Sequence, residues 1–252
     1  MLHKVRLDEV SDGKVYGRRD MVRLGCDDCA GCSECCKTVG DSIVLDPYDY
    51  TMLSAHLGLD AAGMNTKYAS FGPVGAMVLP HLVIDEGKGC RLLSTDGRCT
   101  VHAARPGMCR LFPLARIYEE DRVTYIHQVH ECPKKPNKKV RVEEFIGIRN
   151  MEAYERYLLV WDSFRKAYEN IVTPEITNEA LEEQTKFILT LFYLTPFPVT
   201  KGADGVVDME PFYNAFYRRL DTAYEGLGLI RVPDKEVEDW KHKPIRKTWL
   251  ED

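Results

Sequence analysis

Apolar residues in the second half of the chain recur at helical spacing. From residue 151 onward, large apolar side chains return every three or four positions, as on one face of a helix. The first such stripe comprises Met151, Tyr154, Leu158, Trp161, Phe164, Tyr168 and Ile171. Similar stripes cover 178–194, which stops before Pro196, and 212–227, which ends near Gly226. We predict three helices whose aromatic stripes form a core.

The first half of the chain predicts shorter elements. Ser42 to Leu45 is typical of a brief strand, and Asp46 followed by Pro47 is typical of a helix start that Gly58 would end. Three further segments have the alternation of strands: 77–84, where Pro80 favours a sheet edge, and 114–118 and 122–127, which predict a hairpin.

A basic, proline-containing segment separates the two halves. Pro133 to Arg141 has the composition of a linker. We therefore predict an α+β chain with two domains. Residues 1–140 would form an irregular, cysteine-rich, metal-organised domain, and residues 141–252 an α-helical domain.

The composition indicates the class of the protein and the compartment in which we expect it. The 252 residues are 44% hydrophobic and carry a net charge of −5, which is ordinary for a globular protein and argues against a global basic field for nucleic acid. The N-terminal sequence lacks the apolar core of a signal peptide, and no apolar stretch is long enough to cross a bilayer. We expect a cytoplasmic protein, away from the membrane, that acts with a protein partner or substrate not identified by its sequence.

All nine cysteines lie between Cys26 and Cys132. Thiols stay reduced in the cytoplasm, so this density indicates metal ligands rather than disulfides. The first cluster, 26–36, has the spacing C-x2-C-x2-C-x2-CC, which lets neighbouring sulfurs converge on one metal centre. Its neighbours are polar and glycine-rich rather than apolar, so core packing explains these cysteines poorly.

Four later cysteines bring the count of candidate ligands to eight. The predicted set is Cys29, Cys32, Cys35, Cys36, Cys90, Cys99, Cys109 and Cys132. Eight thiols suffice for two four-thiolate sites, and the role of Cys26 stays open. The side chains of adjacent Cys35 and Cys36 diverge, which favours a polynuclear centre or two centres over one zinc ion. We expect one or two iron–sulfur clusters of the 4Fe-4S type, with zinc as the alternative.

Arginines are interleaved with the later cysteines. They are Arg91, Arg98, Arg105, Arg110 and Arg116. A four-thiolate site of either kind carries about two negative charges and needs nearby donors and cations. We assign Arg105 and Arg110 as residues that support the bound cofactor.

The cysteine pattern resembles the YkgJ-like cysteine-cluster family, described as zinc- or iron-chelating proteins. The resemblance rests on the CxxCxxCC motif at 29–36 and on the block 90–113, which contains Gly-Arg-Cys, then Arg-Pro-x-x-Cys-Arg and Phe-Pro. It covers about the first half of the chain, with Cys26 and His102 as departures. The resemblance implies a metal centre, and the family includes flagellin lysine N-methylases that resemble iron–sulfur proteins.

Three functions follow as hypotheses. The first is an iron–sulfur protein with a redox or metal-dependent accessory role. The second, implied by the resemblance alone, is a protein-lysine N-methyltransferase of the flagellin methylase type. The third is a zinc-stabilised interaction module. No catalytic residue can be assigned, and whether the protein is an enzyme stays open.

Overall fold

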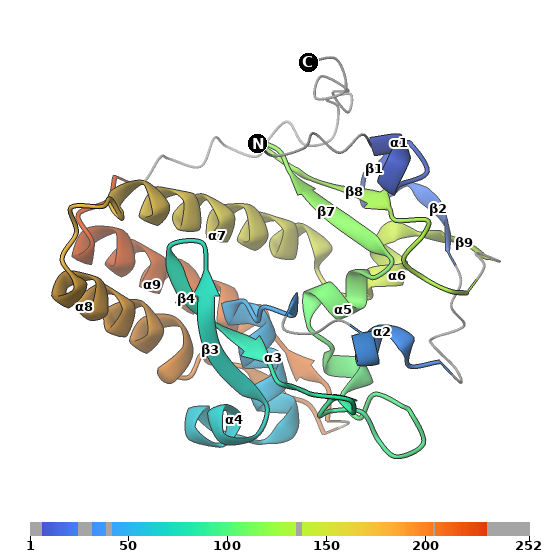
Figure 1. The fold of residues 1–252 in the computed structure, drawn as a ribbon, viewed down its shortest axis with the longest axis horizontal. Coiled ribbons are helices and arrows are strands. Elements are labelled where there is room, and N and C mark those ends of the chain that lie inside the picture. Colours follow the sequence, from blue (N-terminus) through green and yellow to red (C-terminus); the bar gives the residue numbers. More distant parts are fainter. Residues whose placement is uncertain (1–6, 25–31, 39–41, 135–137, 204, 231–252) are drawn as a thin grey trace. The chain divides into compact units, whose positions relative to one another are not determined.

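The computed structural model describes residues 7–24, 32–38, 42–134, 138–203 and 205–230 (Figure 1). It contains both helices and strands, with helices dominating the C-terminal region, so the predicted α+β class is confirmed. None of the helices in these ranges is both long and apolar enough to cross a membrane.

The chain divides into two compact units that interleave in sequence. Unit 1 takes its described residues from Met1–Ala30 and Gly107–Val160, and unit 2 takes them from Gly31–Pro106 and Trp161–Val232. Residue 140, where we predict a domain boundary, lies within unit 1 in this division. One long helix, α7, starts in unit 1 and continues in unit 2, so the boundary falls inside a regular element instead of a linker.

Unit 1 is built on a three-stranded antiparallel sheet with the order β1-β8-β7. Its elements are α1 (Leu7–Val10), β1 (Val15–Tyr16), β2 (Met21–Leu24), α5 (Gly107–Leu111), β7 (Leu114–Tyr118), β8 (Val123–His127), β9 (Lys138–Arg141), α6 (Val142–Ile146) and the start of α7 (Met151–Ile171). Every residue of the central strand β8 is buried. The hairpin of β7 and β8 lies where the alternation predicted it.

The predicted linker is partly wrong. Lys138 to Arg141 forms strand β9, which pairs antiparallel with β2 from Met21↔Arg141 to Leu24↔Lys138. Helix α6 follows at once, and its first two amides donate to the carbonyls of Asp20 and Arg18. The basic composition hid the strand, because its pairing partner lies more than a hundred residues earlier in the sequence.

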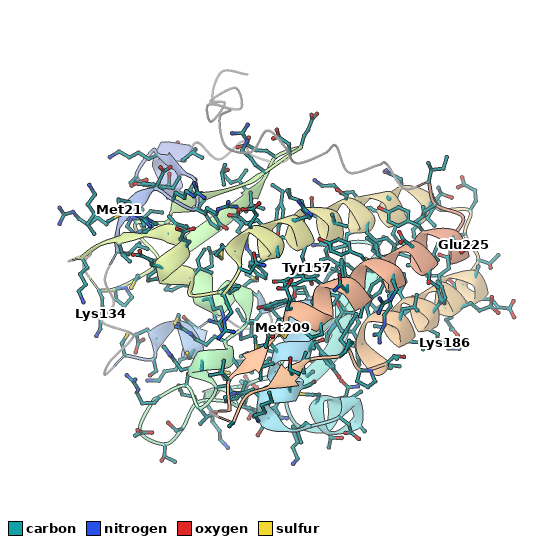
Figure 2. The ribbon with its side chains drawn as sticks, turned by 180° about the vertical axis from the view of Figure 1, so that it is seen from behind. Met21, Lys134, Tyr157, Lys186, Met209 and Glu225 are labelled. Carbon is teal, nitrogen blue, oxygen red and sulfur yellow. The ribbon has the colours of Figure 1, made fainter. Side chains whose placement is uncertain are left out.

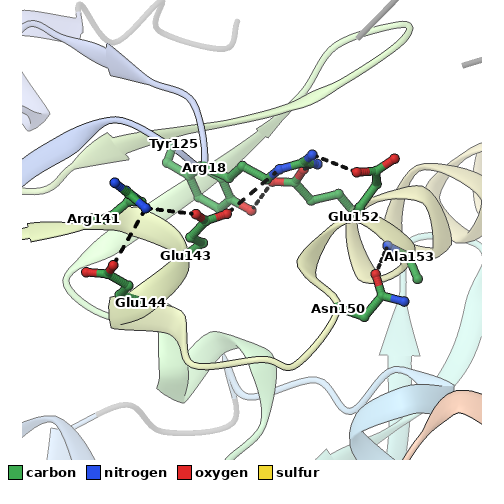
Figure 3. A network of polar contacts seen from close by, with 9 residues as sticks. Arg18, Tyr125, Arg141, Glu143, Glu144, Asn150, Glu152 and Ala153 are labelled. Carbon is green, nitrogen blue, oxygen red and sulfur yellow. Dashed lines mark hydrogen bonds and ion pairs between the residues drawn. The ribbon is translucent and has the colours of Figure 1, made fainter. Parts of the chain in front are cut away.

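A buried ion-pair network joins three segments of unit 1 (Figure 3). Glu155 of α7 is 2% exposed, accepts a hydrogen bond from the Tyr125 hydroxyl at 2.8 Å, and pairs with the Arg18 guanidinium at 3.0 Å. Arg18 also pairs with Glu152 at 2.9 Å. Burial raises the pKa of Glu155, while the bonds from Tyr125 and Arg18 lower it. Removing one member would leave a buried charge short of partners.

Unit 2 combines short strands with most of the helices. Its elements are α2 (Glu34–Thr38), α3 (Pro47–Leu57), α4 (Ala61–Lys67), β3 (Ala69–Val74), β4 (Met77–Leu82), β5 (Ile84–Asp85), β6 (Gly89–Cys90), the 3-10 helix η3 (His102–Ala104), the rest of α7, α8 (Asn178–Leu189), the π-helix η4 (Thr190–Leu194), β10 (Thr200–Lys201), β11 (Val207–Asp208) and α9 (Glu210–Gly226).

The predicted start and end of α3 are confirmed. The Asp46 side chain accepts from the amide of Asp49, and Gly58 closes the helix in the left-handed conformation. The segment before it forms only a single bridge, Val44↔His81, against β4. Strand β4 therefore has β3 on one side and this one bridge on the other, as Pro80 favours.

Aromatic side chains form the core of unit 2. Trp161 packs against Phe192 with ring centroids 5.1 Å apart, Phe164 packs against Tyr224 at 5.4 Å, and Phe212 stacks on Phe216. The predicted helices from residue 151 onward are confirmed, and their apolar stripes form core packing. These rings contribute a large apolar surface to the packing of the helices.

Arg219 fastens the end of the π-helix η4. Its guanidinium donates to the carbonyls of Leu191, Thr195 and Pro196, each at 2.7 Å, and lies 3.9 Å from the centroid of the Phe197 ring. Carbonyls at the end of a helix have no partner within the helix, and this one side chain satisfies the carbonyl of Leu191 in η4 together with those of Thr195 and Pro196 just after it. Burial lowers the pKa of Arg219.

Candidate metal centre

Seven of the predicted metal ligands lie among the described residues. Each is half-buried and is a thiol rather than half of a disulfide: Cys32, Cys35, Cys36, Cys90, Cys99, Cys109 and Cys132. Cys29, the eighth predicted ligand, and Cys26 lie outside the described residues. Five of the seven belong to unit 2, and Cys109 and Cys132 belong to unit 1.

Two turns bring Cys90 and Cys99 together in unit 2. Strand β6 pairs with β5 in the register Ile84↔Cys90, and the chain then folds back so that Leu93 bridges Cys99. Between them, Gly97 adopts φ +75° and its amide donates to the carbonyl of Ser94. A glycine suits this left-handed position because it has no Cβ.

Helix α2, which carries Cys35 and Cys36, packs directly against β6. A Cβ on Gly89 would lie 2.7 Å from the carbonyl oxygen of Cys36 and 3.0 Å from Cα of Lys37. Gly89 also has φ +86°, so two independent features restrict this position to glycine. Because Gly89 has no Cβ, the backbone at Cys36 in the first cysteine cluster can approach strand β6 closely.

The thiols of Cys35, Cys90 and Cys99 lie within electrostatic range of one another. Burial raises the pKa of the Cys90 thiol, a backbone bond with Leu92 lowers it, and the Cys99 and Cys35 thiols raise it further. Burial likewise raises the pKa of Cys99, and Cys35 adds to that rise. Three thiols from two distant segments therefore share one region of unit 2.

Among the described residues, no three cysteine, histidine, aspartate or glutamate side chains are arranged so that they would hold a metal ion. The candidate donors still suit a thiophilic metal, because thiolates are soft ligands. Metal binding commonly supplies the free energy that completes such sites.

Arg105 lies beside this group of thiols. Its Nε donates to the carbonyl of His102 at 3.0 Å, and its charge lowers the pKa of Cys99 against the larger effect of burial. A guanidinium in this place can stabilise thiolate charge. Arg91, by contrast, pairs with Asp85 at 2.8 Å and donates to the carbonyl of Lys67.

The two thiols of unit 1 lie on the chain segments that flank the same end of one hairpin. Cys109 lies in α5, five residues before β7 begins, and Cys132 lies five residues after β8 ends. The pairing Leu114↔His127 closes that end, and the Gln128 amide donates to the carbonyl of Pro113. Arg110, predicted to support the cofactor, is buried next to Cys109 in α5. Arg116 lies over the Tyr154 ring.

Sequence reasoning missed two features, one beside the thiols of unit 2 and one within unit 1. The role of Gly89 was not recognised, although the pattern Gly-Lys-Gly-Cys at 87–90 marks a tight turn before a candidate ligand. The Arg18–Glu155 pair was also missed, and no local signal could have found it, because its members are 137 residues apart.

Half-buried thiols on turns and on a short helix of unit 2 are a pattern typical of a cysteine-rich metal-chelating domain. Residues 28–141 match the CxxCxxCC family, described as "Putative zinc- or iron-chelating domain". The match covers a little under half of the chain and confirms the family resemblance seen in the sequence. No curated protein and no solved structure matches the chain.

Proposed function

We propose that this protein holds an iron–sulfur cluster through cysteine thiolates and serves in a redox or metal-dependent accessory role. The observation that carries the proposal is the grouping of Cys35, Cys90 and Cys99 in unit 2. The chelating family of residues 28–141 supports the coarser role of metal binding. A reducing compartment such as the cytoplasm suits a chain that relies on this many thiols.

The structure of α2 favours a cluster over a single zinc ion. Cys35 and Cys36 are consecutive residues of this helix, so their side chains leave the axis about 100° apart. One tetrahedral ion with four ligands cannot accommodate both sulfurs easily from such directions. A cluster contains several iron atoms, so two neighbouring thiolates that point in different directions can each bind a different iron. Arg105 supplies positive charge near Cys99.

Anaerobic purification with iron and acid-labile sulfide analysis tests the proposal. We expect a brown protein with iron and sulfide in nearly equal amounts, and a Mössbauer spectrum of thiolate-ligated iron. Cys90→Ser and Cys99→Ser should each lose most of the bound iron. Ser33→Ala, on the segment of Cys32 and Cys35, is the matched control and should retain it. A colourless protein with stoichiometric zinc would refute the iron–sulfur proposal and leave metal binding standing.

A further inference from the structure

Strands β2 and β9 form a two-stranded ribbon of unusual charge in unit 1, which we call the basic ribbon (residues 21–24 and 138–141). Its eight residues include Arg23, Lys138, Lys139 and Arg141 and no carboxylate. The chain as a whole has a net charge of −5, so this cationic stretch contrasts with the rest of the molecule. It has no place in the metal-binding proposal.

The pairing register gathers the cations on one face. Residues directly opposite in an antiparallel pair point to the same side of a ribbon. Val22 and Leu24 are each 1% exposed, so their face packs inward. The other face carries the pairs Met21↔Arg141 and Arg23↔Lys139. Met21, labelled in Figure 2, is 43% exposed and Arg23, Lys139 and Arg141 are exposed with it.

This face places two like charges opposite each other. Arg23 and Lys139 are directly opposite, and like charges in that position destabilise a sheet. Neither has an ion pair with another described residue, whereas Arg141 is shared at 3.7 Å between Glu143 and Glu144. The nearby Asp20 carboxylate accepts the Gly17 amide at 2.7 Å within its own turn. Among the described residues, therefore, no carboxylate pairs with the opposed Arg23 and Lys139 to offset their repulsion.

We propose that the exposed face of the basic ribbon docks an acidic segment of a partner protein, bound in extended conformation. Lys139 and Arg141 are two residues apart on one strand, about 7 Å along it. An extended partner that carries a carboxylate at every second position presents the same repeat. Arg23 adds a cation across the ribbon, and Met21 offers an apolar contact at the edge.

An acidic peptide fits this face better than nucleic acid does. Duplex DNA carries one charge per about 1.7 Å of its axis, a density that three cations on a short ribbon do not match. The net charge of −5 also repels a long polyanion more strongly than a short peptide. Arg141 lies 3.7 Å from the carboxylates of Glu143 and Glu144, so carboxylates already approach one end of this face.

Fluorescence anisotropy with the metal-loaded full-length protein tests the inference. The probe is a labelled eight-residue peptide that alternates glutamate and threonine. The double variant Arg23→Gln/Lys139→Gln should weaken its binding about three- to tenfold, since exposed ion pairs contribute roughly 0.2–1 kcal/mol each. Raising the salt concentration should weaken wild-type binding in the same way.

Two matched variants separate docking from general charge. Lys67→Gln/Lys186→Gln removes two exposed cations from helices α4 and α8 of unit 2 and should bind the peptide as the wild type does. Arg23→Lys/Lys139→Arg keeps the charges and should retain binding. Three results would each overturn the proposal. The unit 2 variant could lose as much peptide affinity as the Arg23→Gln/Lys139→Gln variant, or the wild type could fail to bind the peptide at low salt. The wild type could also bind a DNA oligonucleotide of equal charge more tightly than the peptide. Iron content, measured in parallel, tests the metal centre separately.

Discussion

Replacing Gly89 by alanine tests whether the close approach of α2 and β6 shapes the metal centre. The new Cβ would lie 2.7 Å from the Cys36 carbonyl oxygen and 3.0 Å from Cα of Lys37. Both atoms belong to the backbone, so neither can move away by a side-chain rotation. Helix α2 would have to shift as a whole, and with it Cys35 and Cys36.

Gly87→Ala is a matched control on the same turn. Gly87 has φ +70°, and a Cβ there would have nothing within 4 Å. Both variants carry the cost of a left-handed alanine, about 1–2 kcal/mol. Gly89→Ala adds the cost of overpacking, typically about 1–3 kcal/mol. We expect a free energy of unfolding lower by about 1–2 kcal/mol for Gly87→Ala and by about 2–5 kcal/mol for Gly89→Ala.

The metal affinity provides the sharper readout. Because the added contact displaces the segment that carries Cys35 and Cys36, Gly89→Ala should bind Co²⁺ at least tenfold more weakly in a chelator competition, while Gly87→Ala should bind it nearly as the wild type does. Urea denaturation of the metal-free proteins measures the stability difference. Equal stability losses together with equal metal affinities would show that the approach at Gly89 does not govern the site.

Three further predictions concern the packing of each unit and the response to metal. Tyr125→Phe removes the hydrogen bond to the buried Glu155, which should lower the free energy of unfolding at pH 7 by about 1.5–3 kcal/mol. That bond lowers the pKa of Glu155, so the deficit should narrow as the pH falls and Glu155 becomes protonated; urea titrations at pH 7 and pH 5 check the sign, and a deficit that widens would contradict it. Arg219→Ala breaks three hydrogen bonds at the end of η4 and should cost about 2–4 kcal/mol, whereas the exposed neighbour Arg218→Ala should cost under about 0.5 kcal/mol in the same thermal melts. Metal loading should slow amide hydrogen exchange in 32–38 and 89–99, because α2 buries no residue of its own; unchanged exchange there would place the centre elsewhere.

Local signals predicted the regular elements of the chain well. The Asp46 cap, the hairpin at 114–127 and the helix from Met151 to Ile171 each depend on contacts within a short stretch of sequence. Their boundaries could be deduced because capping and periodicity act over a few residues. The π-helical turn at the end of α8 carried no such signal.

Features that depend on distant pairing could not be predicted. The strand β9 forms because β2 lies beside it, and nothing in Lys138 to Arg141 itself favours a strand over a linker. The same holds for the interleaving of the two units. The family motif indicated which cysteines are candidate ligands. The grouping of Cys35 with Cys90 and Cys99 depends on the turn at Gly89, which becomes visible only in three dimensions.

Strand β9 pairs with β2, which precedes the region that matches the family. This pairing determines which part of the chain should be isolated for study. The family match begins at residue 28, after both β1 and β2 have ended. A fragment cut to the matched boundaries would leave one edge of β9 and one edge of β8 with open backbone groups, ready to pair with another copy. It would also lack Arg18 and Glu155, so Tyr125 would lose its buried acceptor. Such a fragment should aggregate for reasons unrelated to its metal, and chelation studies need the longer chain.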